Sequence, residues 1–412
     1  MRLDVALSRL GILAARKTLA PHWEESAAAL GGGTPWFLEP AEVEAARVYG
    51  GFSPEVGSEL QSHARRIASD PALRQVAWHC HRLLYEHPEF DKPQAFPPEL
   101  GGPFYLLVVM GMVRRVRGAH AAMGVPDAVT RETCLQLSCF ARNYAGMSGG
   151  ELGVALTQLY WTRHYPACRL FRLGRMEYMI RGFRGSLVGY RHRSSGLVVA
   201  LAEDGTRFTS EGQLAWEPEG GWAATLTQSP DSVTGYAISP EGMAERRKLR
   251  LQLSEWERVL GPGDPCLDMH IPHGGAMGPE ACADSMRRAA VFFRRFFPQS
   301  PFRAVTCASW IFNTQLERIP LSSDNLVIFQ HELYLFPVPS NGRDGLWFIF
   351  LRDEVDPKTA PRDTSLRRGV ADFLATGERW RGGGMFYLLD DLDAYGSEPY
   401  RSRWPPAGVE VS

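Results

Sequence analysis

The spacing of apolar residues changes near residue 165, and this change constrains the fold more than any other feature of the sequence. Before it, apolar residues recur three and four positions apart, the period of an amphipathic helix. After it, short runs rich in Val, Leu, Phe and Tyr alternate with turns that contain Gly and Ser, as in strands and hairpins. A chain of 412 residues is long enough for two domains. The sequence therefore predicts a helical N-terminal domain at residues 1–165 and a second domain at residues 166–400.

The helical part contains clear helix starts. Asp70 precedes Pro71 and Ser53 precedes Pro54, so a capping side chain stands before a proline at the first helical position. Further helices are predicted at residues 41–49, 103–124, 127–145 and 150–163. The adjacent residues His79, Cys80 and His81 do not predict a metal site, because neighbouring helical side chains diverge by about 100°.

The second part begins with strands and continues with strands that alternate with helices. Strands are predicted at residues 169–180, 185–192, 196–202, 206–210, 266–271, 302–307, 326–336 and 345–351, and helices at 279–297 and 364–376. The segment around Trp256 is helical or extended, and the tail beyond Tyr395 is expected to be loosely ordered. Alternation of this kind predicts an α/β or α+β sheet domain.

Composition excludes several classes of protein. With 45 basic and 46 acidic side chains, the chain lacks the basic surplus of proteins that bind nucleic acid or anionic lipid. The seven cysteines are scattered, without a CxxC pair, which argues against a disulfide framework and a cysteine zinc site. The longest apolar run, at residues 104–113, is about half the length of a membrane helix, and Asp4 and Arg9 interrupt the N-terminus where a signal peptide would be apolar. We therefore expect a cytoplasmic protein that binds neither nucleic acid nor membrane.

The stretch from Asp268 to Gly278 is the strongest functional signal in the sequence. A predicted buried strand runs into a glycine-rich turn, and Pro279 then stands at the first position of the next helix. Such a turn directs backbone N–H groups and the positive end of a helix dipole at one spot, which suits a phosphate. The glycines match neither the Walker loop nor the dinucleotide fingerprint. The stretch is therefore a candidate phosphate site of another kind.

Several segments resemble a family of bacterial acyltransferases, whose members have a helical N-acyltransferase N-terminal domain and a GNAT-like C-terminal domain. The segments that carry the resemblance are Arg142–Tyr144, Phe171–Met176, Gly235–Tyr236, Glu255–Trp256, His270–Pro272, Cys307–Trp310, Ser323–Leu326 and Thr364–Leu366. They occur in the expected order along the chain. The resemblance implies an α+β fold, in which an all-helical domain precedes a mixed β-sheet domain with flanking helices.

The resemblance also implies where an acyl donor binds. In the GNAT fold, the strand before the glycine-rich loop splays from its neighbour, the acyl chain and pantetheine arm lie in that gap, and loop amides bind the pyrophosphate. By analogy, Asp268 and Ile271 line the gap. The residues implied to hold the pyrophosphate of acyl-CoA or acetyl-CoA are His273, Gly274, Gly275, Ala276, Met277 and Gly278. Because this loop departs from the usual GNAT pattern, the phosphopantetheine of an acyl carrier protein is the alternative donor.

Acyl transfer from a thioester to an amine needs a base, donors for the oxyanion and a proton for the leaving thiolate. His270 is the first candidate base, because histidine titrates near neutral pH and this one lies at the strand–loop boundary. Glu177 is the second candidate. Many GNAT enzymes place a tyrosine acid where this chain has Cys307, Ser309 and Trp310, so the acid is unassigned. Ser309 is one candidate donor, and Tyr334 and Tyr387 are more distant alternatives. Cys307 also permits an acyl-cysteine intermediate with His270 as the base.

The sequence thus predicts a two-domain cytoplasmic acyltransferase that uses no metal. It would move an acyl group from an acyl-CoA-type thioester to an amine or hydroxyl of a small acceptor. The alternative is a catalytically inactive GNAT-like module that binds an acyl thioester or a protein partner. The sequence makes no prediction about the identity of the acceptor, the length of the acyl chain or the oligomeric state.

Overall fold

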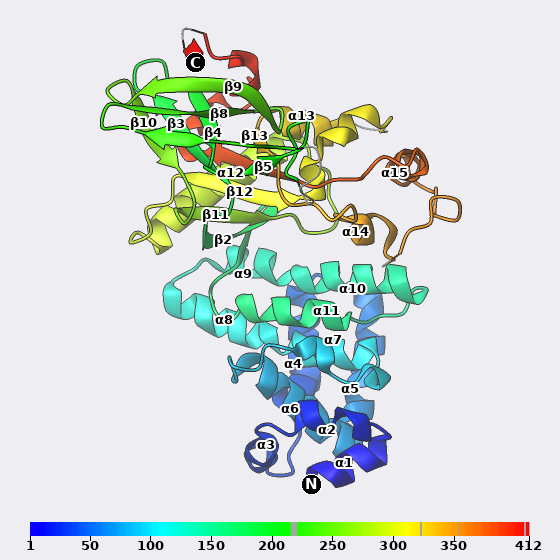
Figure 1. Cartoon of the computed structure of the whole chain (residues 1–412). Helices are drawn as coiled ribbons and strands as arrows, with labels where there is room; N and C mark the ends of the chain where they lie inside the picture. The colour runs from blue at the N-terminus through cyan, green and yellow to red at the C-terminus, as the bar shows by residue number, and fades with distance from the viewer. Residues whose placement is uncertain (216–220, 322–323, 353, 408, 412) are drawn as a thin grey trace. The chain divides into compact units, whose positions relative to one another are not determined.

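The computed structural model describes residues 1–215, 221–321, 324–352, 354–407 and 409–411 (Figure 1). Ser323 of the sequence segment Ser323–Leu326 lies outside this description. The chain divides into two compact units: unit 1 is Met1–Leu173 with Pro272–Gly274, and unit 2 is Gly174–Ile271 with Gly275–Ser412. Helices make up most of unit 1 and sheets with flanking helices make up unit 2, so the predicted α+β class is confirmed. The predicted domain boundary at residue 165 stays a prediction.

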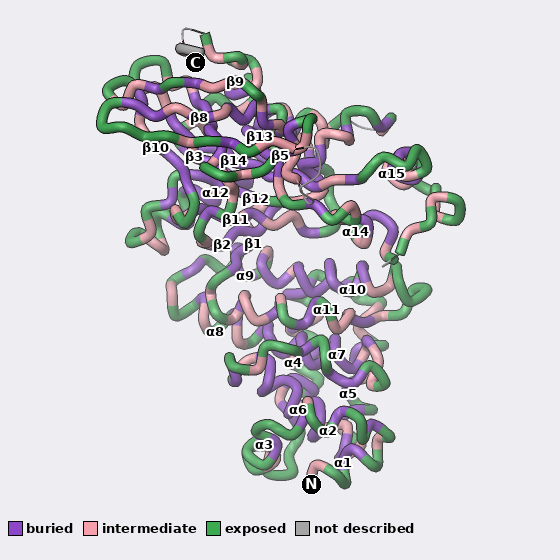
Figure 2. The backbone as a smooth tube through the Cα atoms, in the orientation of Figure 1, coloured by how far each residue is buried: buried purple, intermediate pink, exposed green. Residues whose placement is uncertain are grey.

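Unit 1 is built from helices around a buried central segment. Its α-helices are α1 (Leu3–Leu10), α2 (Arg16–Leu19), α3 (Trp23–Leu30), α4 (Pro40–Tyr49), α5 (Pro54–Ser69), α6 (Pro71–Tyr85), α7 (Gly102–Met110), α8 (Met112–Met123), α9 (Asp127–Cys134), α10 (Gln136–Ser148) and α11 (Leu156–Leu159). Helix α7 carries the longest apolar run of the chain and is buried from Phe104 to Met110 (Figure 2). None of the helices in the described ranges has the length and apolarity to cross a bilayer.

Local chemistry explains where the helices of unit 1 begin and end. Asp70 caps α6 as predicted, because its carboxylate accepts hydrogen bonds from the N–H groups of Ala72 (2.7 Å) and Leu73 (3.2 Å). The single helix predicted at residues 103–124 is wrong in one respect, since Gly111 separates α7 from α8. A Cβ atom at Gly111 would lie 2.5 Å from the His81 ring, so glycine permits this close packing. The helix predicted at 127–145 likewise divides into α9 and α10.

Unit 2 contains two main sheets. One has the strand order β2 (Met176–Gly182), β11 (Pro265–His270), β12 (Ala304–Ser309), β14 (Gly383–Leu388) and β13 (Tyr334–Phe336). The other has the order β10 (Trp256–Leu260), β3 (Leu187–His192), β4 (Val198–Ala202), β8 (Ser232–Ser239), β9 (Met243–Gln252) and β15 (Glu410–Val411), and β7 (Leu226–Gln228) pairs with β8. Strand β5 (Arg207–Phe208) pairs with β6 (Trp222–Ala223) in a separate two-stranded sheet. Strand β1 (Phe171–Leu173) stands at the end of Met1–Leu173 in unit 1.

Hydrogen bonds from buried side chains link helix α12 to the first sheet and the first sheet to the second. On the first sheet, helix α12 (Pro279–Phe296) contacts β2, where the hydroxyls of Tyr178 and Ser285 lie 3.0 Å apart. The Tyr334 hydroxyl of β13 donates to the Ile238 carbonyl oxygen (2.5 Å) and accepts from the Ala200 N–H (3.0 Å). This one hydroxyl therefore ties the first sheet to strands β8 and β4 of the second.

Three expectations for the C-terminal part are wrong. Residues predicted as a strand at 326–336 form helix α13 (Asn325–His331) before β13, and those at 345–351 form helix α14 (Leu346–Phe350). Periodicity does not distinguish a short apolar helix from a buried strand in runs of this length. The tail beyond Tyr395 is ordered where described: Tyr400 donates to the Asp391 carboxylate (2.8 Å) and β15 pairs with β9. The helix predicted at 364–376 is confirmed as α15 (Ser365–Ala375).

Two glycines of unit 1, Gly111 between α7 and α8 and Gly118 within α8, allow a matched test of this packing. We expect Gly111→Ala to lower the free energy of unfolding by about 1–3 kcal/mol, because its methyl group overlaps the buried His81 ring. Gly118→Ala in α8 meets nothing within 4 Å and should raise it by about 0.5–1 kcal/mol, since alanine is the better helix former. Urea unfolding of both variants measures the difference. Equal effects of the two substitutions would contradict this packing.

Candidate functional site

Strands β11 and β12 begin as parallel neighbours and then part. Their register contains only the pairs Leu267–Val305 and Asp268–Thr306. Beyond these pairs β11 continues along β2 as far as His270, and β12 continues along β14 as far as Ser309. Each strand keeps its partner on the outer side, so the two separate without leaving the sheet. A gap therefore opens within the sheet, bounded by the last two residues of β11 and the last three of β12.

A cavity of about 680 Å³ lies at this gap, within unit 2. This is the size of a small-molecule site. Its apolar lining includes Phe183, Met269, Trp310, Phe336, Val338 and Phe348. Its polar lining includes Arg181, Asp268, His270, Thr306 and Ser309. An apolar wall beside a polar rim suits an extended ligand that has a hydrocarbon portion and a reactive polar group.

A charged cluster lines the β2–β11 side of the cavity. The Nε2 atom of His270 lies 3.3 Å from an Asp268 carboxylate oxygen, and an Arg181 guanidinium nitrogen lies 3.4 Å from the same oxygen. Glu177 on β2 stands directly opposite His270 in the antiparallel register and is 1 % exposed. Residues opposite one another share a face, as do residues two apart on one strand. The fold therefore brings Glu177, Asp268 and His270 together on one face of the sheet.

Cys307 and Ser309 also line the cavity, but from the other face of the sheet. Strand alternation places both on the face opposite Asp268 and His270, because Asp268 is the register partner of Thr306. Burial, and then the charge of Asp268, raise the pKa of the Cys307 thiol well above its usual value. The thiol is thus held in its protonated form, which is a poor nucleophile. Ser309 begins a short 3₁₀ turn, where its hydroxyl accepts the Ile311 N–H (3.3 Å) and keeps its own proton available for donation.

The hydroxyls of three tyrosines in this sheet are hydrogen-bonded within the core. Tyr178 bonds with Ser285, Tyr334 with the Ile238 carbonyl, and the Tyr387 hydroxyl donates to the Asp391 carbonyl oxygen (2.7 Å). Burial raises the pKa of all three. None of the residues described as lining the cavity is a tyrosine. The acid, which the sequence leaves unassigned, therefore has no tyrosine candidate among these lining residues.

The glycine-rich loop follows β11 directly and leads into helix α12. Gly274 and Gly275 have φ values of +89° and +80°, the left-handed region that favours glycine. The Arg175 guanidinium donates to the carbonyl oxygens of Ala276 (3.3 Å) and Gly275 (3.2 Å). Gly278 precedes α12 without a side-chain cap, so no capping side chain occupies the first N–H groups of the helix. Loop and helix start together offer backbone donors for an anion.

Sequence reasoning missed several residues of this site. Arg181, Phe183 and Phe336 line the cavity, but none of the three is in a recognisable motif. Arg175 holds the loop and has no predicted role. Arg181 reaches Asp268 only through the cross-strand register, which a single sequence does not reveal. The near-neutral charge of the chain likewise conceals local arginines. Phe171–Met176, a segment that did carry the family resemblance, contains Arg175.

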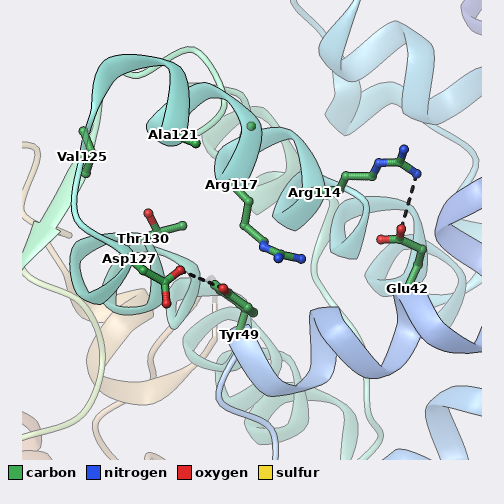
Figure 3. A pocket seen from close by; sticks show the side chains of 9 residues that line it. Glu42, Tyr49, Arg114, Arg117, Ala121, Val125, Asp127 and Thr130 are labelled. Atoms are coloured by element: carbon green, nitrogen blue, oxygen red, sulfur yellow. Dashed lines mark hydrogen bonds and ion pairs between the residues drawn. The ribbon is translucent and has the colours of Figure 1, made fainter.

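A second cavity, of about 510 Å³, lies in unit 1 (Figure 3). Its charged groups pair with one another: Arg114 lies 3.3 Å from Glu42, and the Tyr49 hydroxyl donates to Asp127 (2.7 Å). The Arg117 guanidinium stacks 4.7 Å from the centre of the Tyr49 ring. The lining residues include neither histidine nor cysteine. This cavity is therefore less suited to acyl transfer than the one at the β11–β12 gap.

Comparisons with known proteins agree with this architecture. Residues 170–386 match the family model for a GNAT-like C-terminal domain, and residues 43–165 match that for an N-acyltransferase N-terminal domain. No curated protein matches the chain. Similar solved structures include an acyltransferase in complex with decanoyl-CoA and teicoplanin (21% identity) and one in complex with CoA and 10C-teicoplanin (22%). Each has a TM-score of 0.51 and covers 84% of this chain and 99% of its own, which indicates a shared fold.

The protonated state of Cys307 is open to direct measurement. We expect iodoacetamide at neutral pH to leave Cys307 unmodified in the folded protein, because alkylation requires the thiolate and access to it. Peptide mass mapping after a timed reaction measures this, and all seven cysteines should react in guanidinium chloride. Rapid modification of Cys307 in the native protein would show that its thiol is neither buried nor held neutral.

Proposed function

The chain belongs to the acyltransferase family that combines an N-acyltransferase N-terminal domain with a GNAT-like C-terminal domain, and we propose that it transfers an acyl group from acyl-CoA to an amine or hydroxyl of a small acceptor. The observation that carries this proposal is the parting of β11 and β12 around a cavity beside Glu177, Asp268 and His270. The similar solved structures bind decanoyl-CoA or CoA together with a teicoplanin, which supports a CoA thioester as donor and a small molecule as acceptor.

The donor would lie across the gap. The aromatic wall formed by Phe183 and Phe336, whose rings meet edge to face at 5.6 Å, suits the acyl chain and pantetheine arm. The loop from His273 to Gly278 and the start of α12 would receive the pyrophosphate through backbone N–H groups. Asp268, which lines the cavity, and Ile271, which follows β11 and is not among the lining residues, would flank the donor between these two regions.

The cluster at the gap would supply the base. The acceptor nitrogen or oxygen attacks the thioester carbonyl carbon, and His270 takes the proton that the acceptor loses. Asp268, 3.3 Å from the imidazole, would stabilise the imidazolium that forms, and Glu177 stands opposite His270 on the same face. Backbone N–H groups of the two strands that face the gap would stabilise the oxyanion. The carbon–sulfur bond then breaks, and the departing thiolate accepts a hydrogen bond from Ser309 and gains the proton that His270 took from the acceptor.

A second candidate function is a non-catalytic module that binds an acyl thioester. The observation that favours it is a cavity lining with no tyrosine and with a thiol held neutral at Cys307. Such a module would bind acyl-CoA and be stabilised by it without turnover in a panel of amines. Turnover with any amine or alcohol excludes this reading.

The roles of His270 and Glu177 can be separated from donor binding. We expect His270→Gln to lower kcat by about 10²–10⁴-fold, because the base is lost, while the increase in melting temperature caused by acyl-CoA is retained. Glu177→Gln should lower kcat by a smaller factor, since it removes charge rather than the proton acceptor. Release of free thiol from acyl-CoA in the presence of an amine acceptor measures the rate.

The matched control for these variants is His331→Gln. His331 also has a carboxylate partner, Glu317 at 3.1 Å, but does not line the cavity. It should keep the activity of the unmodified protein. Full activity of His270→Gln across the pH range would remove His270 from the mechanism, and the base would then have to be sought elsewhere in the cavity.

The loop has its own test, based on donors of different length. Arg175→Ala should raise KM for acyl-CoA by about tenfold with little change in kcat, because Arg175 positions the loop through two hydrogen bonds of about 1 kcal/mol each at most. The same variant should leave KM unchanged for an acyl thioester of N-acetylcysteamine, which lacks the pyrophosphate. An equal loss with both donors would show that the loop does not bind the pyrophosphate.

A further inference from the structure

Three side chains with metal-binding atoms meet in unit 1, apart from the acyl-transfer cavity. They are His22, in the turn before α3, and His87 and Glu89, in the segment after α6. Their ligand atoms all lie within 4.8 Å of one another. Two imidazoles and one carboxylate form a donor set that zinc uses when it binds three protein ligands and a water. We propose that His22, His87 and Glu89 bind a Zn²⁺ ion.

The distances between the donor atoms fit an ion of this kind. One carboxylate oxygen of Glu89 lies 2.8 Å from Nε2 of His22 and 3.2 Å from Nδ1 of His87. In a tetrahedral site with zinc bonds of about 2.0–2.2 Å, neighbouring ligand atoms are about 3.3 Å apart. The two imidazole rings are stacked with centroids 3.7 Å apart. Zinc binding would open this stack, and the exposed His22 side chain is the one that can move.

A fourth side chain supplies the outer support that zinc-binding histidines use. The Nδ1 atom of His22 lies 3.4 Å from a carboxylate oxygen of Glu25, on the opposite side of the ring from the nitrogen that faces Glu89. Zinc-bound histidines characteristically donate their second N–H to a carboxylate, which fixes the tautomer and the ring orientation. His22 is therefore flanked by one carboxylate that would share the ion and one that would hold the ring.

His87 differs from the other buried histidines of unit 1. His79, His81 and His120 each place Nδ1 against a neutral oxygen, that of Ser26, the Val108 carbonyl and Thr130 respectively. His87 is 8 % exposed and differs in that its Nδ1 faces a carboxylate. Its Nε2, like those of His79 and His120, is buried without a hydrogen-bond partner among the described residues. The neighbouring His22 has a left-handed φ of +56°, which is unfavourable for a residue with a Cβ atom. The cluster thus has the features of a ligand site rather than of core packing.

A zinc ion here would join segments that are far apart in sequence. It would link the turn before α3 to the segment after α6, and so stabilise the folded state over the unfolded chain in proportion to its occupancy. This site involves none of the residues assigned to acyl transfer. Its test is therefore independent of the proposed function.

The experiment measures zinc binding to the full chain, with any affinity tag removed and after treatment with a chelator. Isothermal titration with zinc chloride at pH 7.5 should give one ion per chain, and the melting temperature should rise with zinc. His22→Asn removes the imidazole while keeping a residue that tolerates the left-handed backbone. Glu89→Gln keeps the shape of the side chain. Each should weaken zinc binding tenfold or more.

The matched control is His63→Asn on α5, where His63 also lies near a glutamate, Glu59 at 3.7 Å. It should leave zinc affinity unchanged. Cobalt substitution identifies the donors, because a site of nitrogen and oxygen ligands lacks the thiolate charge-transfer band that a cysteine ligand would give. Absence of zinc binding by the unmodified protein, or binding that His22→Asn and Glu89→Gln both leave unchanged, would overturn the proposal.

Discussion

The candidate site depends on an interruption of strand pairing. Strand β11 is held along its whole length by β2 and β12 by β14, so both stay in the sheet after their mutual register ends at Asp268 and Thr306. Without those outer partners, two parting strands would leave backbone groups unpaired at considerable cost. The outer pairing therefore permits an opening in the middle of the sheet. The cavity, the cluster around His270 and the start of the glycine-rich loop all lie where the strands separate.

The core around the gap is built so that this opening does not collapse. Tyr178 is fully buried against α12 on one side of the sheet, and Tyr334 links β13 to the second sheet through two hydrogen bonds. Buried aromatic side chains with satisfied hydroxyls are rigid supports, because moving one would expose apolar area and break its bond. Because these hydroxyls are hydrogen-bonded within the core, they are not available in the cavity. In the proposed mechanism, proton transfer therefore rests on the histidine–carboxylate cluster, with Ser309 as a nearby donor.

Much of this architecture follows from the sequence, but its register does not. The helical and strand-rich parts, the glycine loop before α12 and the candidates His270 and Glu177 could be found from periodicity, turn residues and family resemblance. That Glu177 stands opposite His270, and that Arg181 reaches Asp268, depends on how β2 pairs with β11. The helices α13 and α14 were mistaken for strands because short apolar runs fit both periods. The local sequence pattern is therefore insufficient to predict long-range strand pairing and to assign short apolar segments to helix or strand.

The state of Cys307 has a consequence for the chemistry at the gap. A thiolate beside an acyl thioester would exchange with it, and the acyl group would move to the protein rather than to the acceptor. Burial and the Asp268 charge keep the Cys307 thiol protonated and so suppress this exchange. Asp268 also lies 3.3 Å from Nε2 of His270, on the face of the sheet opposite Cys307. In the proposed mechanism, the carboxylate that keeps the cysteine neutral thus stands next to the base, and the acyl group passes to an external acceptor.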